Sequence, residues 1–176
     1  QQSIITALFR NEEVIFSDQH NHSSIVDRIK LSGAKVIVYP HLDYQTLERL
    51  LEKHRGNYNN AGIISDGVFS AHGTVGDVDK INELKSSYNA ISLIDDTHGF
   101  LTVGEKGRGV IDMYKTAPDV LSSSMAKGLA GFGGAVLANG EIFQVLDCFG
   151  RQNINTSHLS PLCAAQSLFN LRKYIQ

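Results

Sequence analysis

The sequence predicts an α/β fold with a mostly parallel sheet and helices on both faces. Six short runs rich in β-branched residues are nearly continuous in apolar character, as expected for strands covered on both faces. Amphipathic stretches separate several of these runs, which is typical of strand–helix alternation. The chain has 176 residues, 42% of them hydrophobic. It therefore has enough apolar material for one domain, which we expect to span residues 1–176.

Each expected element has a local reason. The strands, in chain order, are 13–16 (EVIF), 35–39 (KVIVY), 62–65 (GIIS), 90–94 (AISLI), 119–122 (DVLS) and 134–138 (GAVLA). The helices expected between them are 24–32, 44–54 and 78–88. In the second helix Leu47, Leu50 and Leu51 follow the i, i+3, i+4 spacing of one buried stripe.

Composition excludes several classes of protein. Sixteen Lys and Arg against eighteen Asp and Glu give a net charge of −2, which disfavours nucleic acid and membrane surfaces as partners. No apolar run is long enough for a transmembrane segment, and no signal peptide pattern opens the chain. Cys148 and Cys163 lack metal-ligand spacing, which favours reduced thiols in a cytoplasmic protein. The chain opens without Met, so we expect a segment of a longer protein.

Polar and charged residues follow four of the expected strands directly. Parallel sheets bind their ligands beyond the carboxyl ends of the strands, so these residues are expected to meet at one edge. The segments are 17–22 (SDQHNH), 66–70 (DGVFS), 95–98 (DDTH) and 123–127 (SSMAK).

A lysine and two aspartates in these segments could have chemical roles. Lys127 follows three serines and precedes a glycine-rich stretch, where a lysine can lose solvation and act as an amine nucleophile. The alternative is an ordinary exposed lysine. Asp95 and Asp96 close a buried strand, where a carboxylate can hold the positive charge of a heteroaromatic nitrogen. A cap or a turn is an equally good reason for aspartate there.

The histidines and glycines leave weaker alternatives. His20, His22 and His98 could bind a metal, but no spacing fixes a third ligand. Stacking on, or hydrogen bonding to, a flat cofactor suits an imidazole equally well, and a satisfied core histidine is the default for each alone. The glycine-rich segments 104–109 and 131–134 match neither the dinucleotide nor the P-loop pattern.

Four ordered blocks resemble the α-oxoamine synthases, which are fold-type-I enzymes dependent on pyridoxal 5'-phosphate (PLP). The blocks are 17–35, 65–73, 94–109 and 122–134, with a weaker fifth at 155–161. Together they span nearly the whole chain. The resemblance implies an aspartate aminotransferase-like large domain that is incomplete. It would lack an N-terminal segment, one sheet strand and the C-terminal small domain, so its open sheet edge calls for a covering partner.

The resemblance also implies roles for individual residues. Lys127 is expected to form a Schiff base with PLP, and Asp95 to pair with the pyridinium nitrogen. His22 is expected to stack on the ring, while Ser70 and His98 hydrogen-bond its phenolic oxygen.

Two serines are assigned to the phosphate by the same resemblance. Ser124, three residues before the lysine, takes the place of the usual threonine. Ser157 is expected to reach the phosphate of the neighbouring subunit in a homodimer.

The implied activity is a PLP-dependent acyltransferase that condenses an amino acid with an acyl-CoA thioester. Lys127 would remove the α-proton, and His98 would polarise the thioester carbonyl. The chain departs from the family pattern at 70–73 (SAHG for SMDG), at Arg28 and at Leu101, the last two replacing glycines. These changes spare the cofactor contacts and bear on substrate specificity.

Two other functions remain open. A fold-type-I aminotransferase would use the same Lys127 and Asp95, although His22 and the DDTHG block favour the acyltransferase. A non-catalytic domain or fragment could retain the PLP fold without turnover, and the presence of Lys127 argues against a non-catalytic subunit.

Overall fold

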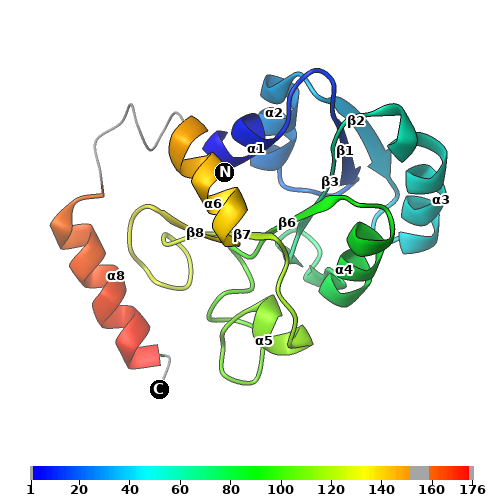
Figure 1. Cartoon of the computed structure of the whole chain (residues 1–176). Helices are drawn as coiled ribbons and strands as arrows, with labels where there is room; N and C mark the ends of the chain where they lie inside the picture. The colour runs from blue at the N-terminus through cyan, green and yellow to red at the C-terminus, as the bar shows by residue number, and fades with distance from the viewer. Residues whose placement is uncertain (1, 151–158, 175–176) are drawn as a thin grey trace.

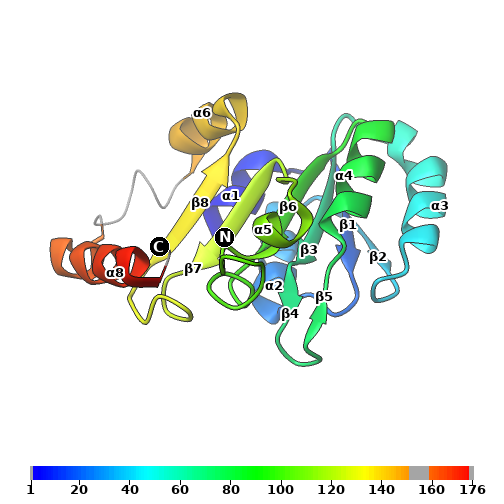
Figure 2. The same cartoon turned by 90° about the horizontal axis from the view of Figure 1, so that it is seen from below.

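The computed structural model describes residues 2–150 and 159–174, in which a six-stranded sheet carries the architecture (Figures 1 and 2). Its strand order is β2-β1-β3-β6-β7-β8, and β8 alone runs antiparallel to its neighbour within the described residues. The bounds are β1 Val14–Asp18, β2 Lys35–Tyr39, β3 Ala61–Asp66, β6 Ile91–Asp95, β7 Val120–Ser124 and β8 Gly134–Ala138. A small hairpin, β4 Val68–Phe69 and β5 Thr74–Val75, lies beyond β3. The predicted α/β fold and all six expected strands are confirmed.

Helices cover both faces of the sheet (Figure 1). The two faces carry separate core clusters, one including residues of α3 and α4 and the other residues of α1, α2 and α6. The helices are α1 Gln2–Leu8, α2 Ser23–Ser32, α3 Tyr44–His54, η1 Arg55–Asn57, α4 Val78–Ser87, α5 Val110–Tyr114, α6 Gly140–Phe149 and α8 Pro161–Tyr174. The three helices expected from the sequence are present, whereas α1, α5 and α6 were not predicted.

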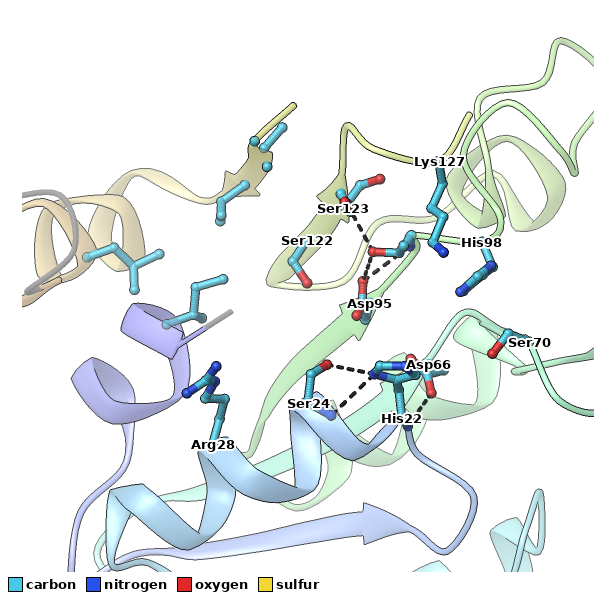
Figure 3. Close-up of a pocket in the computed structure, with 18 of the residues that line it drawn as sticks. His22, Ser24, Arg28, Asp66, Ser70, Asp95, His98, Ser122, Ser123 and Lys127 are labelled. Carbon is cyan, nitrogen blue, oxygen red and sulfur yellow. Dashed lines mark hydrogen bonds between the residues drawn. The ribbon is translucent and has the colours of Figure 1, made fainter. Parts of the chain in front are cut away.

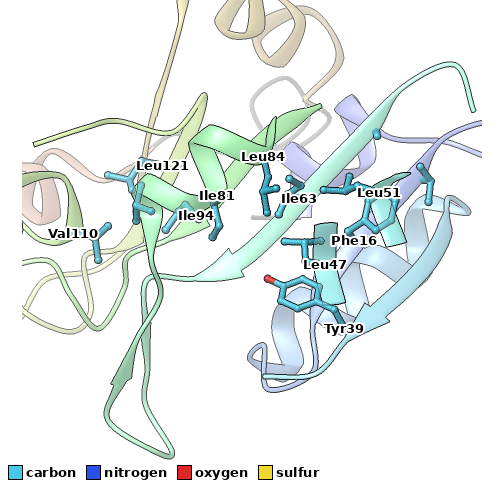
Figure 4. Close-up of a cluster of buried hydrophobic side chains, with 13 residues drawn as sticks. Phe16, Tyr39, Leu47, Leu51, Ile63, Ile81, Leu84, Ile94, Val110 and Leu121 are labelled. Atoms are coloured by element: carbon cyan, nitrogen blue, oxygen red, sulfur yellow. The ribbon is translucent and has the colours of Figure 1, made fainter. Parts of the chain in front are cut away.

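Adjacent residues on the central strands point into opposite clusters. Phe16 and Ile63 pack with Leu47 of α3 on one face (Figure 4), whereas Ile15 and Ile64 belong to the cluster on the other. All five side chains are fully buried. This two-sided burial explains the continuous apolar runs in the sequence.

The edge strands correct one expectation, because β2 and β8 are not covered on both faces. Val38 of β2 is 56% exposed and Leu137 of β8 is 61% exposed. Each of these strands pairs with a single neighbour among the described residues, so its outer side stays open. Leu162 and Phe169 of α8 are also strongly exposed, at 82% and 68%.

Helix ends are fixed by local hydrogen bonds. The side chains of Asp43 and Asp77 accept from backbone N–H groups three residues on and cap α3 and α4. The ring of His22 caps the start of α2, and Gly33, in the left-handed conformation (φ 77°), caps its end. Among the described helices, none combines the length and apolar character that crossing a bilayer requires.

Candidate active site

The polar residues that follow the strands meet in one cavity of about 610 Å³ (Figure 3). Its wall is formed by the carboxyl ends of β3, β6 and β7, the start of α2 and residues of β8 and α6. The predicted site residues that line it are His22, Ser70, Asp95, His98, Ser124 and Lys127. Ser157 lies outside the described residues.

Asp95, the last residue of β6, faces the cavity and is only 4% exposed. Its Oδ1 accepts hydrogen bonds from the N–H and hydroxyl of Thr97, at 3.2 and 2.7 Å. Burial raises the pKa of this carboxyl above its usual range, and the bonds from Thr97 oppose the rise. Asp95 therefore forms a turn and also lines the cavity.

Asp66 ends β3 beside Asp95 in the parallel register. Its Oδ2 accepts a hydrogen bond of 2.7 Å from the backbone N–H of His22. Burial raises the pKa of Asp66 to about 7, and the charge of Asp95 adds to the rise. Two adjacent buried carboxylates favour a cationic ligand in this part of the cavity. Asp66 was not among the predicted site residues, although it too lies at the end of a strand.

His22 is held at the start of α2 with its ring exposed. Its Nδ1 accepts a hydrogen bond from the N–H of Ser24 at 3.2 Å and lies 2.8 Å from the Ser24 hydroxyl. These contacts orient the imidazole where it lines the cavity.

Lys127 lies in the turn that follows β7, and its amine extends toward His98 (Figure 3). The turn is closed by a hydrogen bond from the N–H of Ala126 to the Ser124 hydroxyl, at 3.2 Å. The Lys127 side chain is exposed, so the expected loss of solvation is not seen within the described residues.

Asp96 is fully buried, does not line the cavity and supports the loop beyond β6. Its Oδ2 accepts a hydrogen bond of 3.0 Å from the N–H of Val110, at the start of α5. Burial raises the pKa of Asp96 to about 7. A side chain added at Gly99 or Gly109 would collide with this carboxylate. Of the two adjacent aspartates, Asp95 therefore belongs to the cavity and Asp96 to the loop.

Several lining residues were not assigned to the site from the sequence. The Thr97 hydroxyl donates to Asp95 and accepts from the N–H of Ser124 at 3.0 Å, which joins β6 to the lysine turn. Ser122 and Ser123 have buried hydroxyls without a hydrogen-bond partner within the described part of the chain. The run of serines at 122–124 is visible in the sequence, but the resemblance implied a role for Ser124 alone.

The histidines do not assemble as a metal site. The His20 ring stacks on His41 and His72, with centroids 4.3 and 4.4 Å away, and does not line the cavity. His41 bonds Asp18 and Thr74 through its two ring nitrogens, each at 2.9 Å. Across residues 2–150 and 159–174, no group of three His, Cys, Asp or Glu side chains is arranged to hold a metal ion.

The sequence of the chain is similar to those of known proteins. The sequence model of the family described as aminotransferase class I and II matches residues 1–173. The chain is 40% identical over 175 residues to 8-amino-7-oxononanoate synthase of Geobacter sulfurreducens, covering 96% of this chain and 44% of that protein. It is 44% identical over 132 residues to the same enzyme of Coprothermobacter proteolyticus, covering 74% of this chain and 34% of that protein.

Solved structures show the same fold. The chain matches serine palmitoyltransferase of Sphingomonas wittichii with a TM-score of 0.92 and 24% identity, over 99% of this chain and 44% of the other. It matches 8-amino-7-oxononanoate synthase of Francisella tularensis with a TM-score of 0.84 and 28% identity, over 99% of this chain and 50% of the other. The chain thus spans less than half the length of the curated relatives described above.

Proposed function

The chain belongs to the aminotransferase class I and II family, and from this premise we propose that it forms the cofactor-binding core of a PLP-dependent acyltransferase. The proposed reaction joins an amino acid to the acyl group of an acyl-CoA thioester. The observation that best supports it is that Asp95 and Lys127, from the ends of neighbouring strands, line one cavity of about 610 Å³. A cavity of this size suits a small-molecule ligand.

The residues present fit PLP. Asp95 is a buried carboxylate with no cationic side chain paired to it among the residues described. A buried carboxylate is costly without a positive partner, and a protonated ring nitrogen supplies one. The unpartnered hydroxyls of Ser122 and Ser123 add hydrogen-bond donors in the same cavity.

When bound, PLP supplies an electron sink that stabilises a carbanion at the α-carbon of the amino acid. Asp95 would hold a proton on the ring nitrogen of bound PLP, which would maintain that sink. Lys127 would hold the cofactor through its Nζ and would take up the α-proton of the amino acid. In the net reaction the α-carbon would bond to the thioester carbonyl carbon in place of sulfur, and CoA would leave as its thiol with the proton lost from the α-carbon.

The remaining residues bind and orient the reactants. His22 would pack over the cofactor ring, Ser70 and His98 would hydrogen-bond its phenolic oxygen, and Ser124 would contact the phosphate. His98 would also polarise the thioester carbonyl. Ser157, which lies outside the described residues, would reach the phosphate of a neighbouring subunit.

A homodimer in the cytoplasm completes the proposal. Exposed Leu162 and Phe169 of α8 and exposed Leu137 of β8 supply apolar surface that an assembly can cover. The free thiols of Cys148 and Cys163 suit a reducing compartment.

The test is an absorbance spectrum of the 176-residue chain with PLP, before and after borohydride, with peptide mapping of the reduced product. We expect a visible band that borohydride removes and a reduced adduct on Lys127. Lys127→Ala should lose both, whereas Lys106→Ala, which removes an exposed loop lysine, should retain both. A band and an adduct that survive in Lys127→Ala would refute the assignment of this lysine.

The second candidate is an aminotransferase, because the matching family is named for that activity. Incubation of the PLP-loaded chain with an amino acid and an acyl-CoA separates the two. Thiol release with the cofactor recovered as PLP supports the acyltransferase. Conversion of the cofactor to pyridoxamine phosphate, without thiol release, supports the aminotransferase. A chain that binds PLP and does neither is a non-catalytic PLP domain.

A further inference from the structure

Asn21 carries a buried amide in the loop between β1 and α2, directly before His22. The residue is only 7% exposed. Its Oδ1 accepts a hydrogen bond of 2.8 Å from the N–H of Asp66. Its Nδ2 donates to the carbonyl oxygen of Ile64 at 2.8 Å and to the hydroxyl of Ser17 at 2.9 Å. A buried amide whose donor and acceptor atoms are all bonded is held in one orientation.

Two of these hydrogen bonds continue the pairing of β1 with β3. The register of the two strands ends at the pair Ser17 and Ile64. In a parallel ladder, a strand residue donates to the residue before its partner and accepts from the residue after it. The Asn21 amide forms both of these bonds around Ser65. One side chain therefore takes the place of the next peptide group, so the chain can leave the sheet for α2 while the end of β3 stays bonded.

The same contacts fix the start of α2 at the cavity. The backbone N–H of Asp66 is bonded to Asn21, and its Oδ2 accepts a hydrogen bond of 2.7 Å from the N–H of His22 (Figure 3). The ring of His22 is exposed, so packing contributes little to holding it in place. Its position at the cavity wall therefore depends on how the backbone is held at the end of β3.

We propose that Asn21 is a positioning residue that sets the place of His22 over the ring of PLP, a role that rests on the proposed function. Asparagine suits this role because its side chain offers donors and an acceptor from one planar group, whereas an ionised aspartate offers acceptors alone. Asn21 does not line the cavity, so its effect on the cofactor must pass through a residue that does.

The experiment is a double-mutant cycle on the dissociation constant of PLP, measured by absorbance with the 176-residue chain. Asn21→Ala should weaken PLP binding by about tenfold in the wild-type background and by less than about twofold in the His22→Ala background. Asn60→Ala, which removes an exposed amide just before the start of β3, should leave the constant unchanged in both.

A loss confined to the wild-type background supports the inference, because a general loss of stability would lower affinity in both backgrounds. A tenfold loss that persists beside His22→Ala would overturn it, as would equal affinities of wild type and Asn21→Ala. Far-UV circular dichroism checks that each variant is folded. If Asn21→Ala does not fold, Asn21→Asp, which keeps the size of the side chain and its acceptor, takes its place in the cycle.

Failure of the proposed function is distinguishable from failure of this inference. If the wild-type chain does not bind PLP, the proposed cofactor is refuted, and amide hydrogen exchange tests the role of Asn21 without it. The exchange rate at His22, divided by the rate at Ile63 within β3, should then rise about tenfold in the Asn21 variant. The rate at Ile63 corrects for any change in global stability. An unchanged ratio would overturn the positioning role.

Discussion

The Thr97 hydroxyl donates a hydrogen bond of 2.7 Å to Oδ1 of Asp95 and thereby fixes the orientation of the carboxylate that faces the cavity. The same oxygen accepts from the N–H of Ser124, so one side chain joins the acidic end of β6 to the lysine turn after β7. Because its hydroxyl forms both hydrogen bonds, Thr97 positions the site without being a reacting group.

Thr97→Val is therefore expected to weaken PLP binding by about tenfold, because it removes one donor to Asp95 and one acceptor for Ser124. Thr97→Ser keeps the hydroxyl and should bind within about twofold of wild type. The measurement is PLP titration followed by absorbance. Equal affinities in the Val and Ser variants would show that the hydroxyl has no positioning role.

Asp66 gives the folded chain a dependence on pH. Burial raises its pKa to about 7, from a usual value of 3.8. Between these values the unfolded chain releases the proton while the folded chain keeps it, so this group lowers the free energy of unfolding as pH rises through that window. In the Asp66→Asn variant the amide side chain cannot ionise, and its oxygen can still accept a hydrogen bond from the N–H of His22.

The Asp66→Asn variant should exceed wild type in stability by about 1 kcal/mol or more at pH 8, and the difference should shrink toward pH 4.5. Urea denaturation without cofactor at both pH values measures it. Asp27→Asn, an exposed change on α2, should alter stability little at either pH. A gain for Asp66→Asn that is larger at pH 4.5 than at pH 8 would contradict the sign.

Leu101 adopts the left-handed conformation, with φ of 64°. A Cβ atom in this conformation costs about 1 kcal/mol or more, and glycine avoids that cost. Leu101→Gly should therefore be more stable than Leu101→Ala by about 1 kcal/mol, as measured by urea denaturation. Both variants lose the side chain beyond Cβ, so the comparison isolates the backbone. An Ala variant as stable as the Gly variant would argue against strain here.

Gly99 packs against the buried carboxylate of Asp96, so Gly99→Ala is expected to lower the free energy of unfolding by about 2 kcal/mol. Gly140 is the matched control, because an added Cβ at this first residue of α6 meets nothing within 4 Å. Gly140→Ala should leave stability unchanged or raise it slightly. Thermal unfolding of both variants measures the difference, and a neutral Gly99→Ala would mean that the loop relaxes around the added methyl.

Much of the sheet was predictable because burial on both faces makes each central strand a short apolar run. Two of the helices that were not predicted were less visible for physical reasons. α5 has only five residues, and it begins after Gly109 without a side-chain cap. α6 keeps Phe143 and Phe149 exposed, at 57% and 56%, so its apolar residues do not mark a single buried stripe.

The site was predictable where it depends on strand ends, because parallel strands bring their carboxyl ends to one edge. The sequence could not separate Asp95 from Asp96 by role, since only the loop closing on Val110 turns Asp96 away from the cavity. The role of Thr97 depends on its hydrogen bond from Ser124 of another strand, which no local spacing predicts. Its place in the site required the three-dimensional structure.

The cavity wall draws on chain segments from residue 4 to residue 147, so it exists only once β3, β6, β7 and β8 have assembled with α2 and α6. A ligand that binds this assembled state alone shifts the balance between folded and unfolded molecules by mass action. With PLP as that ligand, a cell short of vitamin B6 would hold a larger unfolded fraction for proteases to degrade. The abundance of the protein, and not only its activity, would then follow the vitamin supply.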